Sequence, residues 1–270
     1  MSLHRDVKSI TVNTLSRMKS DGEKIACLTA YDASFAAVLD RAGVEVILVG
    51  DSLGMVIQGF DTTVPVTVDD MVYHTRCVSR AVQRALIIAD MPFLSYCWPE
   101  QALSTAARLM QEGGAHMVKL ESGTTQIATV ARLSEQSVPV CAHLGLRPQS
   151  IHKLGGYHVQ GKDDHSAQAM LEDALALQDA GADILLLECI PGLLAAEITA
   201  NVELPVIGIG AGVSCDGQIL VLQDILGITQ GKTPRFAQNF LQGVQSIQEA
   251  ILSYVQAVKN HSYPGPEHTF

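Results

Sequence analysis

The sequence predicts an α/β fold, a closed (β/α)8 barrel, on the strength of three observations. Seven short apolar runs of strand type alternate with stretches of helical periodicity, and a short eighth run follows near residues 219–222. The runs are apolar on both faces, which is typical of parallel strands covered by helices. The length of 270 residues suits such a barrel, which takes about 250 residues. A doubly wound open sheet is the competing architecture, and the strand count favours the barrel.

The expected elements follow these patterns in chain order. Strands are expected at residues 25–30, 45–50, 85–89, 117–120, 138–142, 184–187, 206–209 and 219–222. Helices are expected at residues 34–41, 68–84, 100–111, 125–135 and 167–180. Three units repeat one pattern: a helix ends at a glycine (Gly43, Gly114 or Gly181), an apolar strand follows, and an acid comes seven or eight positions after the glycine. This repetition indicates successive βα units of one barrel.

The chain is expected to form a single domain over residues 1–270, because no Pro- or Ser-rich linker or low-complexity segment interrupts it. After about residue 234, an amphipathic helix at 237–258 is expected as a C-terminal extension beyond the barrel. Its apolar residues should be buried against the barrel or a neighbouring subunit, which favours a homo-oligomer. These residues are Phe236, Phe240, Val244, Ile247, Ile251, Leu252 and Val255.

Composition and charge exclude several classes of protein. The chain has 18 Lys and Arg against 28 Asp and Glu, a net charge of −10, so bulk charge disfavours nucleic acids and anionic membranes as partners. The apolar runs are much shorter than the roughly 20 residues of a membrane-spanning helix, and residues 1–21 do not resemble a signal peptide. The six cysteines are scattered without CxxC spacing. This favours the cytoplasm and argues against disulfides or structural zinc.

Acidic residues stand where four of the expected strands end. They are Asp51, Asp90, Glu121 and Glu188. The carboxyl ends of barrel strands form the active-site rim, so these side chains should converge. Any one of them could instead cap a helix, but four neighbouring carboxylates repel one another. A hard divalent cation such as Mg²⁺ would relieve that repulsion, and the sequence offers no His/Cys cluster for zinc or iron.

Two rim residues have neighbours that suggest a chemical role. Glu188 lies between apolar residues, which should raise its pKa toward the range useful for proton transfer; a buried acid paired with a lysine or the backbone is the alternative. Lys119, in a Val-Lys-Leu strand, must reach a partner. It could form a Schiff base, hold a substrate carboxylate, or pair structurally with a rim acid.

Two further features allow both a functional and a structural interpretation. His143, at the end of the fifth expected strand, is a candidate substrate hydrogen-bond donor or a satisfied core histidine. Residues 208–212, Gly-Ile-Gly-Ala-Gly, resemble a phosphate-binding loop, and a tight turn explains them equally.

Strings across most of the chain resemble the ketopantoate hydroxymethyltransferase family. They include LTAYDASFA (28–36), VGDSLGMVIQG (49–59), DMPF (90–93), MVKLE (117–121), VPVCAHLGLRPQS (138–150), GGYHVQG (155–161), LLLECIP (185–191), VIGIGAG (206–212) and CDGQILVLQDILGI (215–228). The similarity runs from about residue 14 to residue 266. It implies a TIM barrel of the phosphoenolpyruvate/isocitrate-lyase type and assembly into a homodecamer or a smaller ring.

The resemblance also implies roles for individual residues. Asp51 and Asp90 match magnesium ligands that also meet the substrate, and Glu121 matches an acid that reaches the metal directly or through water. Ser52 and Lys119 match groups that hold the keto-acid carboxylate, and Glu188 matches the catalytic base. These roles favour the carboxylate-holding function of Lys119 over a Schiff base.

The reaction implied is Mg²⁺-assisted enolate formation from 3-methyl-2-oxobutanoate and hydroxymethyl transfer from 5,10-methylenetetrahydrofolate, giving ketopantoate for pantothenate and coenzyme A biosynthesis. Two alternatives remain. One is a lyase of the phosphoenolpyruvate-mutase type, for which Cys97 would be the reactive cysteine, although the KKCGH-like string of such lyases is absent. The other is a non-catalytic barrel, against which four rim acids and a lysine argue.

Overall fold

The computed structural model describes residues 8–229, 231 and 233–270, and these contain a closed parallel barrel of eight strands in chain order. The strands are β1 (Ile25–Thr29), β2 (Val46–Val49), β3 (Leu86–Asp90), β4 (Met117–Glu121), β5 (Val140–Gly145), β6 (Ile184–Glu188), β7 (Val206–Ile209) and β8 (Gly217–Leu220). β8 pairs with β1 and closes the ring. The predicted barrel is confirmed, with its last strand two residues earlier than expected.

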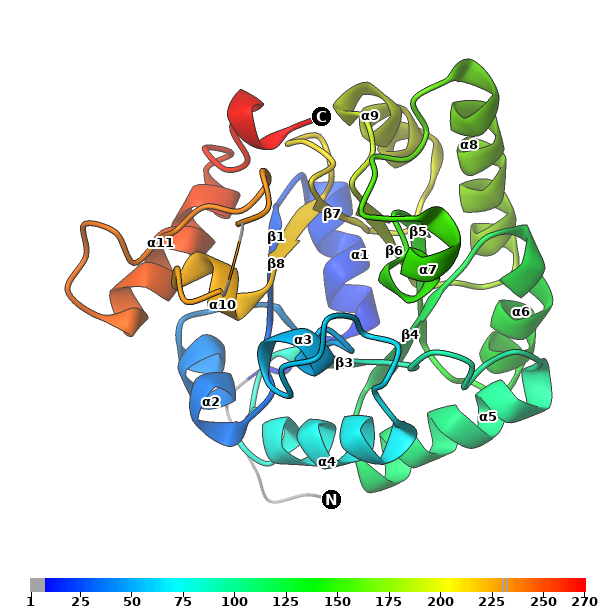
Figure 1. Cartoon of the computed structure of the whole chain (residues 1–270), viewed down its shortest axis with the longest axis horizontal. Helices are drawn as coiled ribbons and strands as arrows, with labels where there is room; N and C mark the ends of the chain where they lie inside the picture. The colour runs from blue at the N-terminus through cyan, green and yellow to red at the C-terminus, as the bar shows by residue number, and fades with distance from the viewer. Residues whose placement is uncertain (1–7, 230, 232) are drawn as a thin grey trace.

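Helices surround the barrel (Figure 1). They are α1 (Val12–Asp21), α2 (Ala33–Arg41), α3 (Leu53–Val56), α4 (Val68–Ser79), α5 (Pro99–Ala107), α6 (Ile127–Glu135), α7 (Ile151–Leu154), α8 (Asp164–Asp179), α9 (Gly192–Asn201), α10 (Leu222–Ile225) and α11 (Ile247–Lys259). Among the helices of the described ranges, none is long and apolar enough to cross a membrane.

The helix expected at 68–84 is shorter in the structure, where α4 ends at Ser79. The Asp40 carboxylate accepts hydrogen bonds from the backbone N–H groups of Gln83, Arg84 and Ala85. These bonds satisfy donors that a helix would otherwise satisfy, and they lead the chain directly into β3.

Helix α1, which was not expected, lies across the N-terminal end of the barrel. Its N-cap is Thr11, and it buries Leu15 and Met18. Lys19 forms an ion pair with Asp216 at 2.9 Å and donates to the carbonyl of Leu204. Asp216 directly precedes β8, and Leu204 lies just before β7. Since α1 covers this end, a ligand must enter the barrel from the opposite, C-terminal end.

The C-terminal segment differs from the expected long helix. Helix α11 begins at Ile247, not at residue 237, and the Ser246 side chain caps it. Residues 237–246 form irregular backbone with bends and one turn, and the Phe240 N–H donates to the carbonyl of Ile225 at 2.8 Å. The prediction of a helix over 237–258 is therefore wrong in its first half, since Asn239 and Gly243 interrupt the helical pattern with turns.

Helix α11 packs on the strands where the first and last parts of the barrel meet. The Tyr254 hydroxyl lies 2.8 Å from the carbonyl oxygens of both Cys27 in β1 and Gln218 in β8. Its ring makes edge contacts with Phe240 and Tyr263. Ile251 is fully buried beside it. The helix thus covers the seam between β8 and β1.

Candidate active site

The predicted rim residues converge at the C-terminal end of the barrel. Strand register places Asp90 beside Lys119, and Glu121 beside His143. Together they line a cavity of about 580 Å³ that also contains Asp51, Ser52 and Glu188. This volume is within the range of about 300–1,000 Å³ typical of small-molecule sites.

Asp51 and Asp90 form a buried pair of carboxylates. Their residues are 5% and 2% exposed. The Asp90 carboxylate accepts a hydrogen bond from the Asp51 backbone N–H at 2.9 Å. Burial raises the pKa of Asp51 to about 7, and the Asp90 charge adds to the rise, while Lys119 and Gln149 oppose it. Two neighbouring carboxylates repel each other when both are ionised, and a bound cation would relieve that repulsion.

Lys119 is the counter-charge of this pair. Its ammonium group lies 2.6 Å from the Asp90 carboxylate, and the residue is 6% exposed. Burial alone would lower the Lys119 pKa, but the charges of Asp90 and Asp51 outweigh it and raise the pKa above its ordinary value. Lys119 therefore stays protonated at neutral pH, which favours anion binding over Schiff-base formation.

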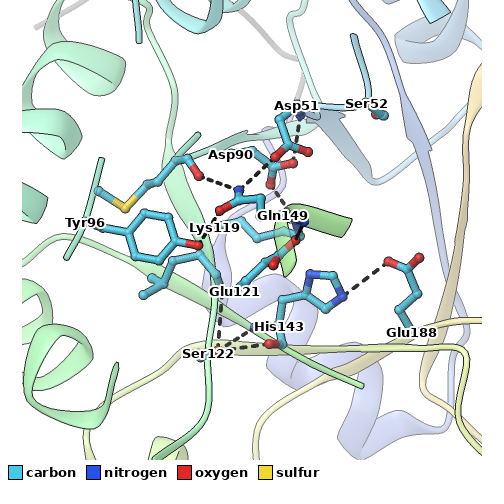
Figure 2. Close-up of polar contacts among 12 residues, drawn as sticks. Asp51, Ser52, Asp90, Tyr96, Lys119, Glu121, Ser122, His143, Gln149 and Glu188 are labelled. Carbon is cyan, nitrogen blue, oxygen red and sulfur yellow. Dashed lines mark hydrogen bonds and ion pairs between the residues drawn. The ribbon is translucent and has the colours of Figure 1, made fainter. Parts of the chain in front are cut away.

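Gln149 links two of the rim acids, Asp51 and Glu121, and was not among the residues expected from the sequence (Figure 2). Its side-chain amide donates to Asp51 at 2.8 Å and to the carbonyl of Met91 at 2.9 Å. Its amide oxygen accepts from the Tyr96 hydroxyl at 2.6 Å, and its backbone N–H donates to Glu121 at 2.9 Å. The one signal for it was the long connection after β5, because long barrel loops often carry functional residues.

We expect Gln149→Leu to destabilise the protein by about 2–4 kcal/mol, because it leaves the Tyr96 hydroxyl and the Met91 carbonyl buried without their partner. Thermal or urea unfolding measures the loss. Gln168→Leu on the exposed face of α8 is the matched control and should change stability little. Unfolding of Gln149→Leu at the wild-type midpoint would contradict the anchoring role.

Glu188 and His143 form the other side of the cavity. The Glu188 carboxylate and the His143 Nε2 atom are 3.3 Å apart, as Figure 2 shows. Burial raises the pKa of Glu188 to about 8, against the opposing charge of Lys119. Burial also lowers the pKa of His143 well below its ordinary value, aided by Lys119, so the ring is neutral. Neither ring nitrogen makes a well-formed hydrogen bond with a described residue. This arrangement favours the ligand-binding interpretation of His143 over that of a core histidine.

Ser52 follows Asp51 at the start of the β2 loop. Its hydroxyl lies 2.9 Å from that of Tyr31, which follows β1. Gly50 makes this approach possible, since a methyl group there would come within 2.7 Å of the Ser52 oxygen. Tyr31 was missed in the sequence, where nothing distinguished it from a core tyrosine.

Two sequence hypotheses lose support from the geometry. Gly208 and Ile209 end β7, and residues 210–212 begin the connection to β8, with Gly210 and Gly212 at positive φ. The connection leads into a strand and not into a helix N-terminus, which a phosphate loop of the expected kind requires. Cys97 is exposed and lines a separate cavity of about 200 Å³. This cavity shares Glu121 with the main one, but Cys97 is not among the residues that line the main cavity.

The donor set determines which metal the site suits. Among the residues that the structure describes, no group of three or more His, Cys, Asp or Glu side chains is arranged to hold a metal ion. Glu121 instead faces the backbone of Gln149. The adjacent oxygens of Asp51 and Asp90 nevertheless fit Mg²⁺, which takes one or two protein carboxylates and fills its remaining positions with water and substrate.

Solved structures of known proteins share this fold. A 2,3-dimethylmalate lyase, described as a PEP mutase/isocitrate lyase superfamily member, has a TM-score of 0.56 at 16% identity, over 80% of this chain and 81% of that one. A phosphonopyruvate hydrolase in complex with oxalate and Mg++ has a TM-score of 0.61 at 12% identity, over 94% and 98%. At these identities the likeness concerns the fold, and it confirms the phosphoenolpyruvate/isocitrate-lyase type of barrel.

Sequence relatives identify the family. The family model described as ketopantoate hydroxymethyltransferase matches residues 9–266. The 3-methyl-2-oxobutanoate hydroxymethyltransferase of Alkalilimnicola ehrlichii is 61% identical, over 97% of this chain and 95% of that protein. The protein of the same name from Halorhodospira halophila is 55% identical, over 99% and 97%. The chain belongs to the ketopantoate hydroxymethyltransferase family, and the transferase class expected from the sequence is confirmed.

Proposed function

We propose that the chain adds a hydroxymethyl group to C3 of 3-methyl-2-oxobutanoate, with Mg²⁺ at Asp51 and Asp90 and 5,10-methylenetetrahydrofolate as the one-carbon donor. Keto acid, folate and water give ketopantoate and tetrahydrofolate. The observation that carries the proposal is the buried arrangement of two carboxylates, one ammonium and a separate carboxyl of raised pKa in a single cavity. The family provides the identity of the substrates.

Each residue then has a task that follows from its position. Lys119 and the Ser52 hydroxyl hold the keto-acid carboxylate, and this charge pairing admits an anion to an acidic rim. Asp51 and Asp90 hold the ion, and Glu121 orients its surroundings through Gln149. Bound Mg²⁺ supplies Lewis-acid stabilisation of the negative charge that develops on the keto oxygen. A phosphonopyruvate hydrolase of the same fold has a structure in complex with oxalate and Mg++, so a barrel of this kind can hold this ion together with a small carboxylate ligand.

Glu188 removes the C3 proton. Its burial makes the carboxylate a stronger base than an exposed one, and a base is most effective when its pKa lies near the working pH. His143, held neutral 3.3 Å from Glu188, can donate one hydrogen bond that orients the carboxylate or the substrate. Proton removal and carbon–carbon bond formation therefore occur between the Asp51–Asp90 side and the Glu188 side of the cavity.

The deciding experiment is deuterium exchange at C3 of 3-methyl-2-oxobutanoate, followed by proton NMR with purified protein and Mg²⁺ in D₂O. This half-reaction needs no folate, so it tests the carboxylate and metal chemistry by itself. Exchange that depends on Mg²⁺ supports the proposal, and its absence in folded protein overturns it. A lyase of the phosphoenolpyruvate-mutase type would instead cleave a carbon–carbon or carbon–phosphorus bond of its own substrate.

The exchange rate should depend on pH through Glu188. A base works only when deprotonated, and the pKa of Glu188 is raised to about 8. We therefore expect the rate to rise about tenfold per pH unit below that pKa and to level off above it. The positive charge of bound Mg²⁺ shifts the rise to lower pH. A pH-independent rate between pH 5.5 and 9 would contradict the assignment.

We also propose that the protein works in the cytoplasm as a homo-oligomer, with the decamer as the first expectation from the family resemblance. All six cysteines lie in the described part of the chain and are unpaired there, which suits a reducing compartment. The apolar residues after Pro234 support an oligomer less strongly than expected, because Phe240, Ile251 and Val255 are already buried within the chain. Ile247 and Leu252 remain exposed and are the ones that a neighbouring subunit could cover. Light scattering at micromolar concentration should report a multimer, and a monomer would contradict it.

A further inference from the structure

One buried carboxylate in the cavity has no part in the chemistry described so far. Asp224 belongs to α10, directly after β8, and is 5% exposed. The backbone N–H of Leu222 donates to the Thr29 side chain at 3.0 Å, which fixes α10 to the end of β1 at the active-site rim. Asp224 lines the same cavity as Asp51 and Glu188.

Asp224 is short of hydrogen-bond partners for a buried acid. Its Oδ1 atom accepts from the Thr229 hydroxyl at 2.5 Å. Within the ranges that the structure describes, no donor contacts its Oδ2 atom and no cation pairs with it. Asp40, a structural acid of this chain, accepts three backbone N–H groups. Asp224 Oδ2 is not one of the fully enclosed side-chain atoms that lack a partner, so it is open to the cavity, where a ligand can reach it.

The surroundings of Asp224 indicate the shape of that ligand. Phe236 and Phe270 line the cavity, and both rings lie on Gly210, since a methyl group there would come within 2.9 Å and 3.1 Å of them. Aromatic walls of this kind suit a flat ring system. Burial raises the pKa of Asp224, and the Thr229 hydroxyl opposes the rise.

Asp224 lines the same cavity as the reacting groups. Tyr31 contacts Ser52 through its hydroxyl, and the charges of both Asp90 and Asp224 contribute to raising the Tyr31 pKa. Tyr31 thus lies on the keto-acid side of the cavity, and Thr29, two positions earlier in the chain, holds the N–H of Leu222 in the helix that carries Asp224. A ligand that meets Asp224 at one end can present its other end to the carbon activated by Glu188.

We propose that Asp224 recognises the pterin ring of the folate by accepting hydrogen bonds from its ring N3–H and its 2-amino group. These two donors lie side by side on one edge of the pterin, and a carboxylate accepts two parallel N–H groups with its two oxygens. Oδ1 can bind Thr229 and the ligand together, because each carboxylate oxygen has two lone pairs. The inference rests on the proposed function, since it takes the folate as co-substrate.

The test compares binding of two small probes by anaerobic calorimetry: 6-methyltetrahydropterin and its analogue with a methyl group in place of the 2-amino group. Neither carries a one-carbon unit, so no turnover occurs. The wild type should prefer the amino compound by about tenfold or more, and Asp224→Asn should lose that preference. A wild type without preference overturns the proposal whether or not the variant folds.

Thr229→Val is the matched control for a structural role. It removes the described partner of Asp224 but keeps the carboxylate. We expect Asp224→Asn to weaken tetrahydrofolate binding by about 10- to 100-fold and Thr229→Val by no more than about threefold. Equal losses in the two variants would show that Asp224 only anchors its loop, and would overturn the proposal.

The C3 exchange assay separates this inference from the proposed function. Folate-independent exchange in the wild type supports the hydroxymethyltransferase chemistry whatever Asp224 does. If exchange occurs and Asp224→Asn still prefers the amino pterin, the pterin site is wrong and the chemistry stands. If the wild type does not exchange, the proposed function fails, even if pterin binding depends on Asp224.

Discussion

Glu188→Gln should lower C3 proton exchange and hydroxymethyl transfer by about 10²–10⁴-fold, the usual effect of removing a positioned base. The amide keeps the size and the hydrogen-bonding capacity of the side chain 3.3 Å from His143, but it cannot take the proton. Substrate and metal should still bind, because Asp51, Asp90 and Lys119 are unchanged.

Deuterium exchange and thermal unfolding measured on one preparation distinguish a catalytic Glu188 from a structural one. A structural role would reduce stability and leave exchange per folded molecule unchanged. Glu197→Gln, on the exposed face of α9, is the matched control and should behave as the wild type. Near-normal exchange in a stably folded Glu188→Gln protein would remove Glu188 from the mechanism and make His143 the next candidate.

Asp51→Asn and Asp90→Asn should each weaken Mg²⁺ binding by more than about 100-fold, because each removes one of the two carboxylate ligands of the ion. Calorimetric titration with Mg²⁺ measures this without turnover. Asp183→Asn is the control, since its carboxylate binds the backbone of Val140 at the opposite end of the barrel. Wild-type affinity in the Asp51/Asp90 double variant would refute the metal site.

The same two variants should change metal-free stability in opposite directions. Because the folded pKa of Asp51 is raised to about 7, the fold loses stability as pH rises from the ordinary value of about 4 through about 7, and the cost is complete at pH 8. Asp51→Asn removes that cost, so its melting temperature at pH 8 should rise. Asp90→Asn leaves Lys119 without its 2.6 Å partner, so its melting temperature should fall.

The barrel could be predicted because each strand carries its own signal. An apolar run after a glycine that ends a helix fixes a βα unit without information from distant residues. The C-terminal helix could not be placed as well, because its first half depends on Phe240 docking on Ile225 and on turns at Asn239 and Gly243. Those contacts are tertiary, and helical spacing of apolar residues does not reveal them.

The residues of the site also differ in whether the sequence could identify them. Asp51, Asp90, Glu121 and Glu188 could be identified because strand ends of a barrel converge on one rim. Gln149 and Asp224 could not, since they lie in a loop and a short helix whose positions depend on the folded chain. The resemblance implied that Glu121 reaches the metal directly or through water; in the structure one of its oxygens accepts from the backbone N–H of Gln149, and this contact depends on the loop after β5.

The seam covered by α11 has a consequence for synthesis of the protein. The Tyr254 hydroxyl reaches a β1 carbonyl across 227 positions of the chain, and β8 pairs with the same strand. At translation rates of about 5–20 residues per second, β1 leaves the ribosome roughly 10–45 seconds before these partners. For that time one edge of a first strand that is fully buried in the native fold has no native neighbour, so the barrel closes only after nearly the whole chain is made. A nascent chain stalled before α11 should therefore bind a hydrophobic-segment chaperone that the complete chain releases.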